Sequence, residues 1–587
     1  MIGEVDGVDE RPRDSPSESG DHAGVKRWLT SSGGGLALAM LALWLALAPA
    51  HIVDGDNAEL ATLGTLGGAA HPPGYPLYLL YLRAFSWLPA SSPAHAAALA
   101  TALLAALHVL VLHAACRAWG VRAFAATLAC AIYATSPIVL REYCEADVFA
   151  LNGLVVSAVL WLSAAAGPLR GGRRAVMLGL VAGLGLANNT SCVMFAPLGL
   201  YGVWFAWREA RLRALYAIVG LAIGMLPYAY LFIARDGAGT WGAVRSLGDA
   251  VAMFIRSDYG AGQLSAHKAD VSLATREGAM LGDIARAWLV VPLVGAGWAF
   301  VRRLRSPSRG IWIALALTVV IVGPVFAIGL NVPPTGYGAW LVPRFHLLAI
   351  LVLSIPIATG IDLVVDRVRP ALRIVVLVVV VAVNLVLSLP WLARVHSSIM
   401  EDGVTNLLRS LPKDAIVIAT PDDINFGGTY AQEVLGERRD VTVLIWQLVA
   451  ADWYRRRIEA QGIALGPVPI SSVKVAEGIV ASQRPLFVDI FQANILGAFP
   501  AVPYGTVFRV LPKGTPMPPI EEAVAENRAL FAKFILVDPP RASDDVPALV
   551  YARYAQTWHI LAEGLARAGR GAEAQQAAAI ADALLPQ

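Results

Sequence analysis

Three acidic residues, Asp54, Asp56 and Glu59, follow closely after the first long apolar run of the chain, residues 33–50. An unpaired charge is costly in hydrocarbon, so acidic side chains at such a boundary are expected to face water or a binding site. A carboxylate can act as the general base for a hydroxyl acceptor when its environment tunes its pKa. Asp56 is the predicted base, and Glu59 follows it by one turn on the same face of a helix.

The same residues allow two other interpretations. Asp56 and Glu59 have the spacing of a capping box, in which the first is the N-cap and the second reaches back to it. Residue type alone favours this role as strongly as catalysis. Asp54 and Asp56 also form an Asp-x-Asp sequence, which could hold a divalent cation together with phosphate oxygens. The metal requirement is therefore left open.

A stiff turn follows between His71 and Pro76, because it contains three prolines and one glycine. The prolines fix φ, and the glycine allows a close approach of the backbone. His71 could contact a phosphate or the acceptor, and Tyr75 could line the same site. The alternatives are a hydrogen-bonded loop histidine and a tyrosine of the interfacial belt.

Three later segments carry further candidate binding residues. They are Arg141, Glu145 and Asp147 in one connection and Arg256, Asp258 and Tyr259 in another, whereas Arg344 and His346 open the tenth apolar run at its outer end. The acids could orient an acceptor or a cation, and the arginines could stabilise a phosphate leaving group through charge-assisted hydrogen bonds. The alternatives are a solvated acidic loop, which residue type favours for Asp147, and snorkelling or salt-bridged arginines.

The composition is that of a polytopic membrane protein. Of the 587 residues, 57% are hydrophobic and 15% charged, and the mean hydropathy is +0.59. The formal net charge of +3 gives no reason to expect a nucleic-acid partner. Residues 1–31 are rich in polar residues, proline and glycine, which predicts a disordered cytoplasmic tail.

Eleven apolar runs are long enough to suggest tilted membrane helices. They are residues 33–50, 95–115, 122–139, 148–166, 175–187, 190–207, 214–234, 284–301, 310–329, 341–361 and 374–391. With eleven spans, every arginine-rich connection falls on one side, which the positive-inside rule makes cytoplasmic. The predicted transmembrane domain is 32–393, in the plasma (inner) membrane, with the candidate site and the C-terminal part outside. Residues 75–88 are too short to span and predict an interfacial helix.

The remainder of the chain predicts two smaller units. Short β-branched runs at 415–420, 441–446 and 486–490, with a helical pattern at 429–436, predict an extracytoplasmic α/β domain over 394–548 with a largely parallel sheet. Residues 549–587 predict a tetratricopeptide-like helical hairpin. The pair Asp422 and Asp423 could bind a ligand, but capping of the next helix is favoured.

The motifs together resemble one known family. They are Asp-x-x-Glu at Asp56, His-Pro-Pro-Gly-Tyr-Pro at His71, Asp-Val-Phe-x-Leu-Asn at Asp147, Arg-x-Asp-Tyr-Gly at Arg256 and Arg-Phe-His at Arg344. This pattern resembles the transmembrane O-mannosyltransferases that modify IPT domains of plexin-type receptors, and their bacterial relatives, within the GT-C superfamily. Segments after residue 411 resemble the soluble tail of that family, so the resemblance covers residues 33–515.

The resemblance implies a GT-C fold, a polyprenyl-phosphate-linked sugar donor from the membrane lipid, and an inverting single displacement. Asp56 is then the base, with Glu59 beside it, and the sugar is mannose. The acceptor is a hydroxyl of a protein or of a glycan. The chain departs from the family at Asp147, where glutamate is expected, and at Phe149, where tyrosine is expected, so acceptor preference is left open.

Two other functions compete with a glycosyltransferase. One is a transporter or flippase of lipid-linked sugars, and the other is a non-catalytic membrane scaffold. A transporter is expected to have internal repeats and charged or broken helices near the membrane midplane. Here the acids gather at one face and no repeat is evident, which favours the enzyme.

Overall fold

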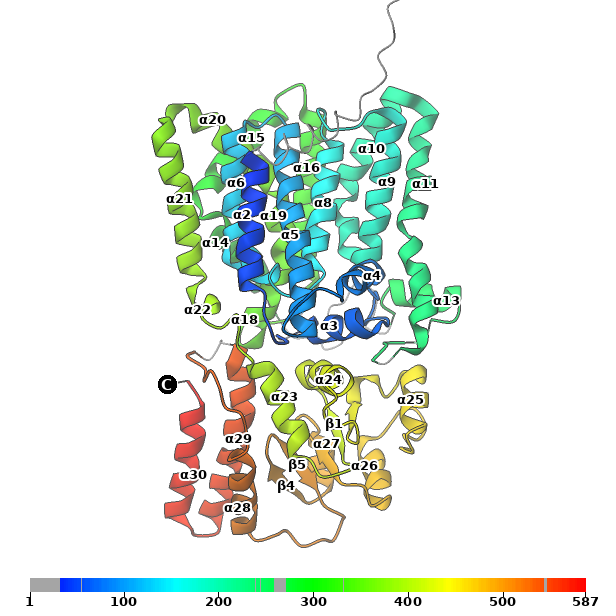
Figure 1. Cartoon of the computed structure of the whole chain (residues 1–587), viewed down its shortest axis with the longest axis vertical. Coiled ribbons are helices and arrows are strands. Elements are labelled where there is room, and N and C mark those ends of the chain that lie inside the picture. Colours follow the sequence, from blue (N-terminus) through cyan, green and yellow to red (C-terminus); the bar gives the residue numbers. More distant parts are fainter. Residues whose placement is uncertain are drawn as a thin grey trace, which may run out of the picture.

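The computed structural model has two parts stacked along its longest axis, a helical bundle and a smaller α/β part (Figure 1). It describes residues 32–53, 55–237, 239–242, 244–257, 271–330, 332–542 and 546–586. The predicted tail and the candidate residues Asp54, Asp258 and Tyr259 lie outside these residues.

Each predicted apolar run contains at least one helix of the bundle. The main ones are α2 (Ser32–Leu47), α5 (Pro93–Ala118), α6 (Ala123–Thr135), α8 (Phe149–Ser163), α9 (Gly171–Asn188), α10 (Ala196–Ala210), α11 (Tyr216–Gly224), α14 (Leu273–Trp288), α15 (Val291–Leu304), α16 (Arg309–Val320), α19 (Leu347–Val352), α20 (Ser354–Val364) and α21 (Pro370–Leu387). The chain is therefore a multi-pass helical membrane protein.

Within the described part of the chain, fewer helices are long enough to cross a membrane than the eleven spans predicted. Among the described residues, four helical segments are long and apolar enough to cross a membrane, or six if two bent pairs each count as one span. One bent pair, α14 and α15, turns by 101° at Leu289 and Val290, where both residues have positive φ. Helices α2, α6 and α8 are apolar but shorter. Bends and short helices thus divide runs that look continuous in the sequence.

Helices α9 and α11 approach each other closely because glycines line their contact. A Cβ atom on Gly179 would clash with the carbonyl oxygen of Ala217, and one on Gly220 would clash with that of Val176. Small residues at four-residue spacing let the backbones of membrane helices meet. The same spacing continues the contact at Gly183.

Two short helices, α3 (Asn57–Leu66) and α4 (Pro76–Phe85), lie at the end of the bundle that faces the α/β part (Figure 1). Each has ten residues, too few to cross a bilayer. Residues 75–88 therefore form no span, as predicted. The two helices carry the first group of candidate residues to the boundary between the two parts.

The α/β part contains a mixed five-stranded sheet. Its strands are β1 (Ile416–Ala419), β2 (Thr442–Ile445), β3 (Leu486–Val488), β4 (Ala501–Tyr504) and β5 (Val507–Val510), in the order β2-β1-β3-β5-β4. The three predicted strands pair in parallel, whereas β5 is antiparallel to both β3 and β4. The predicted parallel pairing is therefore correct for β1, β2 and β3, whereas β4 and β5 add antiparallel pairs. The sequence missed β4 because Pro503 lies in it, and proline is tolerated in such edge strands.

Helices cover the sheet and end the chain. They are α23 (Ile399–Ser410), α24 (Asp422–Thr429), α25 (Asp452–Glu459), α26 (Ser472–Ala481), α27 (Ala493–Ala498), α28 (Ile520–Phe531), α29 (Val546–Arg567) and α30 (Gly571–Leu584). Helices α29 and α30 form the expected hairpin, although α29 begins before the predicted boundary at residue 549. The favoured role of Asp422 and Asp423 as caps is wrong, because the N-cap is Pro421 and Asp423 forms an ion pair with Arg553.

Polar contacts join the α/β part to the bundle. Glu401 of α23 accepts a hydrogen bond from the backbone N–H of Ile52 at 3.4 Å and lies 3.2 Å from Nδ1 of His51. Arg457 of α25 donates a hydrogen bond to the carbonyl oxygen of Thr240 at 2.9 Å. These contacts place α24 and α25 against the end of the bundle.

The glycine contact between α9 and α11 yields a stability prediction. We expect Gly179→Ala to lower the midpoint of thermal unfolding in detergent, because overpacking costs about 1–3 kcal/mol. Gly297→Ala in α15 is the matched control, since no atom lies within 4 Å of its added Cβ and alanine favours the helix. Equal midpoints for the two variants would contradict the close packing of α9 on α11.

Candidate functional site

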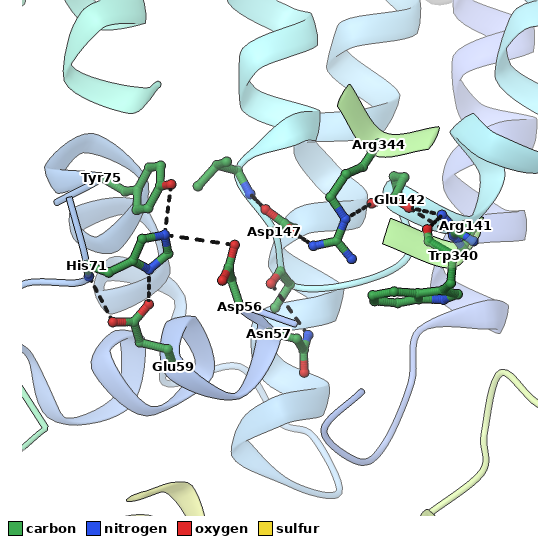
Figure 2. A network of polar contacts seen from close by, with 12 residues as sticks. Asp56, Asn57, Glu59, His71, Tyr75, Arg141, Glu142, Asp147, Trp340 and Arg344 are labelled. Carbon is green, nitrogen blue, oxygen red and sulfur yellow. Dashed lines mark hydrogen bonds and ion pairs between the residues drawn. The ribbon is translucent and has the colours of Figure 1, made fainter. Parts of the chain in front are cut away.

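Three functional side chains surround His71 (Figure 2). Glu59 accepts two hydrogen bonds from this residue, one from its backbone N–H at 2.8 Å and one from Nδ1 at 2.6 Å. On the other side of the ring, Nε2 lies 3.1 Å from the Tyr75 hydroxyl and 4.0 Å from Oδ2 of Asp56. The structure therefore brings together four residues that the sequence singled out separately.

The capping-box interpretation of Asp56 and Glu59 is wrong. Asp56 is the N-cap of α3, but its side chain makes no capping hydrogen bond, and Glu59 turns to His71 instead of back to the helix start. The two acids differ in access, because 34% of the Asp56 side chain is exposed and only 4% of the Glu59 side chain. Asp56 is thus the acid that a substrate can reach.

The environment of His71 favours its charged form. Burial by itself lowers the pKa of His71, but the charges of Glu59 and Asp56 and the hydrogen bond to Glu59 outweigh burial and raise it to about 9. At neutral pH the ring is therefore an imidazolium that donates from both nitrogens. Its Nε2 lies 4.0 Å from Oδ2 of Asp56, so this positive charge is placed beside the carboxylate of the candidate base.

Aromatic rings from both parts of the molecule enclose the imidazole. It stacks on Phe426 of α24 with centroids 6.1 Å apart and planes inclined by 27°. The rings of Trp241 and Tyr75 meet it edge to face, with centroids 6.1 and 5.1 Å away. The α/β part thus supplies one wall of a site whose acids come from the bundle.

A second group of charges lies beside the first, around Arg344 (Figure 2). Its Nη1 is 3.7 Å from Oδ2 of Asp147, and its Nε is 3.7 Å from Oε2 of Glu142. The guanidinium lies over the ring of Trp340 at 4.5 Å from the centroid. Arg141 donates hydrogen bonds to Glu142 and to the carbonyl oxygen of Trp340, so it positions this group.

Arg344 has hydrogen-bonding capacity that the described part of the protein does not use. Its side chain is 3% exposed, and within the described residues its Nε and Nη2 have no hydrogen-bond acceptor. A Cβ atom on Gly55 would lie 2.9 Å from Nη1 of Arg344, so the guanidinium lies against the backbone next to Asp56. Buried donors usually have partners, so this arginine fits an anionic substrate group.

Glu145 and Asp147 are both buried, so the solvated-loop interpretation of Asp147 is wrong. Burial raises the pKa of Asp147 to about 7; the charge of Arg344 opposes this rise, and that of Asp56 adds to it. Burial and the charge of Glu142 raise the pKa of Glu145 to about 8. Burial therefore favours the neutral forms of both acids, which limits the negative charge at the site.

The remaining candidates differ in their distance from these groups. Arg256 lies close enough for its charge to lower the pKa of His71. His346 is buried and pairs with Asp283 of α14 at 2.8 Å, away from the contacts around His71. Trp340 and Phe426 are site residues that the sequence did not single out. Trp340 lies four residues before its partner Arg344, a spacing that offered a weak signal, whereas Phe426 contacts His71, which lies far away in the chain.

Family models match both parts of the chain. Residues 56–213 match "Protein O-mannosyl-transferase TMEM260 N-terminal domain", and residues 400–481 match "TMEM260-associated domain 2". The chain is 24% identical over 446 residues to Protein O-mannosyl-transferase TMEM260 of Mus musculus, covering 69% of this chain and 61% of the mouse protein. It is 22% identical over 236 residues to the Dictyostelium discoideum protein of that name, covering 36% of this chain and 29% of that relative. The chain thus spans about three fifths of the mouse relative.

Solved structures share the fold. ArnT from Cupriavidus metallidurans bound to undecaprenyl phosphate matches with a TM-score of 0.52 and 14% identity, over 85% of this chain and 99% of ArnT. The apo state of ArnT matches with a TM-score of 0.54 and 12% identity, over 83% and 98%. These findings confirm the GT-C-like fold and the resemblance to the transmembrane O-mannosyltransferase family.

The charge of His71 makes stability depend on pH. A pKa raised from 6.5 to about 9 stabilises the fold fully below pH 6.5, and this stabilisation is lost as pH rises through about 9. The full effect is about 3 kcal/mol. We expect the thermal midpoint of the wild type to fall over this range and that of Glu59→Gln to change less. Glu477→Gln, which alters an exposed ion pair, is the control; an unchanged slope in Glu59→Gln would contradict the assignment.

Proposed function

We propose that this chain, a relative of the TMEM260 O-mannosyltransferases, is an integral-membrane inverting glycosyltransferase. It moves a sugar, which we take to be mannose, from a polyprenyl-phosphate donor to a hydroxyl of a protein or glycan on the extracytoplasmic face. The observation that carries this proposal is the pairing of an accessible carboxylate, Asp56, with a buried arginine, Arg344, whose Nε and Nη2 have no hydrogen-bond acceptor among the described residues.

The two residues fit the two ends of a single displacement. Asp56 takes the proton as the acceptor oxygen attacks the anomeric carbon of the sugar. The bond from that carbon to the phosphate oxygen breaks, and the configuration inverts because the attack comes from the opposite side. The negative charge that develops on the departing polyprenyl phosphate is stabilised by Arg344, and Arg256 adds positive charge nearby.

His71 and Asp147 position this chemistry. The imidazolium of His71, held by Glu59, places its positive charge beside Asp56 and orients this carboxylate. Asp147 lies 3.7 Å from Arg344 and holds the guanidinium until a phosphate arrives. Because burial raises the pKa of Asp147 to about 7, this acid can take up a proton when the phosphate brings further negative charge to the site.

The same site favours an enzyme over a transporter. The functional side chains around His71 come from α3 and from the turn before α4, at the end of the bundle beside the α/β part (Figure 1), whereas a transporter is expected to carry charged or broken helices near the membrane midplane. A divalent cation near Asp54 and Asp56 stays a prediction. Ligand atoms of Asp56, Glu59 and His71 lie within 4.8 Å of one another, but a cation there would have to displace a proton from His71.

The proposed topology has eleven spans with the N-terminus in the cytoplasm and the C-terminal part outside. Contacts between distant connections support this arrangement. Arg122, after α5, pairs with Asp362 of α20 at 2.8 Å, and the backbone N–H of Gly171 donates to Glu209 of α10 at 2.5 Å. The arginine-rich connections thus lie beside each other, as the positive-inside rule requires for cytoplasmic loops.

The role of Asp56 is tested with purified full-length protein and radiolabelled mannosyl-phosphoryl-polyprenol. We expect Asp56→Asn to lower transfer by about a thousandfold, since the amide cannot accept the proton. Asp249→Asn, which changes an exposed acid at a helix start, is the control. Transfer by Asp56→Asn at the wild-type rate would remove Asp56 from the mechanism.

The role of Arg344 is tested by the conservative change Arg344→Lys. An ammonium group keeps the charge but loses the planar fork of donors, so we expect kcat to fall about a hundredfold while the protein remains folded. Arg245→Lys, an exposed arginine next to the start of α13 (Leu247–Phe254), is the control. Full activity of Arg344→Lys would show that the fork does not hold the leaving group.

A further inference from the structure

A cavity lies where helix α3 meets the α/β part, and Glu59 lines it whereas His71 does not. Its empty volume, including its mouth, is about 410 Å³. The bundle contributes Glu59, Thr62 and Trp241, and the α/β part contributes Phe426, Trp453 and Arg457. The mechanism proposed above uses neither the cavity nor the residues of α25.

Aromatic rings from both parts of the molecule line the cavity. The ring of Trp241 lies 6.2 Å from that of Phe426 and 6.1 Å from that of Trp453, with planes inclined by 47° and 46°. Phe426 also stacks on His71, so the same ring borders the cavity and the candidate site. A ligand in the cavity would therefore be separated from the imidazole of His71 by the phenyl ring of Phe426.

The polar groups of the lining already have partners. Both oxygens of Glu59 accept hydrogen bonds from His71, and Arg457 donates to the carbonyl oxygen of Thr240. The hydroxyls of Thr62 and Thr429 donate to the carbonyl oxygens four residues before them on their helices. A sugar ring would bury several hydroxyls that need new partners, whereas an apolar side chain needs none. The lining thus favours an apolar side chain.

The distance to the base suggests how such a side chain arrives. Along α3, Glu59 is three residues beyond Asp56, which corresponds to about 4.5 Å of helix rise. In an extended peptide, side chains two residues apart point the same way and lie about 6.6 Å apart. An acceptor peptide could therefore present a hydroxyl to Asp56 and place the side chain two residues away in the cavity beyond Glu59.

We propose that this cavity is the acceptor subsite of the enzyme and that it takes an apolar side chain two residues from the serine or threonine that receives the sugar. The inference rests on the proposed function. It assigns acceptor choice to the junction of the bundle with the α/β part, and it makes a polypeptide in extended conformation the acceptor.

The test compares two synthetic acceptors with the full-length protein. One is acetyl-Val-Gly-Thr-Gly-Val-amide, and the other is acetyl-Gly-Gly-Thr-Gly-Gly-amide, which has nothing to place in the cavity. With radiolabelled mannosyl-phosphoryl-polyprenol, we expect kcat/KM to be about tenfold higher for the valine peptide, the usual discrimination by a small apolar pocket. Equal values in the wild type would overturn the inference.

Two variants and a control link the preference to the cavity. Trp453→Ala removes one wall, and Thr429→Trp fills the space, so in both the ratio of the two kcat/KM values is expected to fall to about one. Phe491→Ala removes an aromatic ring of the same domain that is 66% exposed and lines no part of the cavity, and it should keep the ratio. A wild-type ratio in both cavity variants would overturn the inference.

A binding measurement separates this inference from the proposed function. Both peptides are titrated into the Asp56→Asn protein, whose binding does not depend on turnover. Tighter binding of the valine peptide, abolished by adding Thr429→Trp, supports the subsite even if no transfer is seen with the wild type, an outcome that would count against the proposed function alone. Transfer to a glycan acceptor in preference to both peptides would overturn the inference and leave the glycosyltransferase intact.

Discussion

The contact between Glu59 and His71 is the interaction on which the rest of the site depends. A carboxylate that is 4% exposed would be strongly destabilising without a partner, and the histidine supplies two donors to it. One of them is a backbone N–H, so the contact fixes the proline-rich turn as well as the ring. The ring can then face Asp56 and Tyr75 with its second nitrogen. This ion pair thus sets the position and orientation of the His71 ring and favours its positive charge.

Burying so many charges at the end of a membrane bundle requires shielding from water and from lipid. The α/β part provides it, because Phe426 of α24 covers the imidazole that α3 and the turn hold in place. Glu401 and Arg457 fasten this cover to the bundle through backbone groups. Exclusion of water strengthens the interactions of Arg344 and Asp56 with a developing charge, since both act through a medium of low dielectric constant.

Much of this arrangement was predictable from local sequence. The acids after the first apolar run, the rigid turn at His71 and the basic residue Arg344 were identified by type and position, and the three parallel strands by their β-branched runs. The choice of partner for Glu59 was not predictable, because a capping box and a contact with His71 require the same spacing on α3. The burial of Asp147 was equally hidden, since an acidic loop looks the same whether water or an arginine neutralises it.

Other features depend on contacts between residues far apart in the chain. The number of spans could not be read from hydropathy, because the sharp turn at Leu289 and Val290 places positive φ at residues whose types give no sign of it. Phe426 lies in a domain hundreds of residues after His71, and only the docking of α24 on α3 brings the two rings together. Such contacts follow from the packing of whole elements, which local patterns do not encode.

The position of Phe426 has a consequence for how this fold can vary. Asp56, proposed to act on the acceptor hydroxyl, and Arg344, proposed to act on the donor phosphate, belong to the bundle, whereas a wall of the adjoining cavity belongs to the α/β part. A change in α24 or α25 can therefore alter what approaches Asp56 without altering the groups that hold the phosphate. The limit on such change is the stack of Phe426 on His71, because a shift of this ring would disturb the imidazole that orients the base. Under the proposed mechanism, other residues of α24 and α25 can change and alter the choice of acceptor, whereas the contact between Phe426 and His71 has to stay.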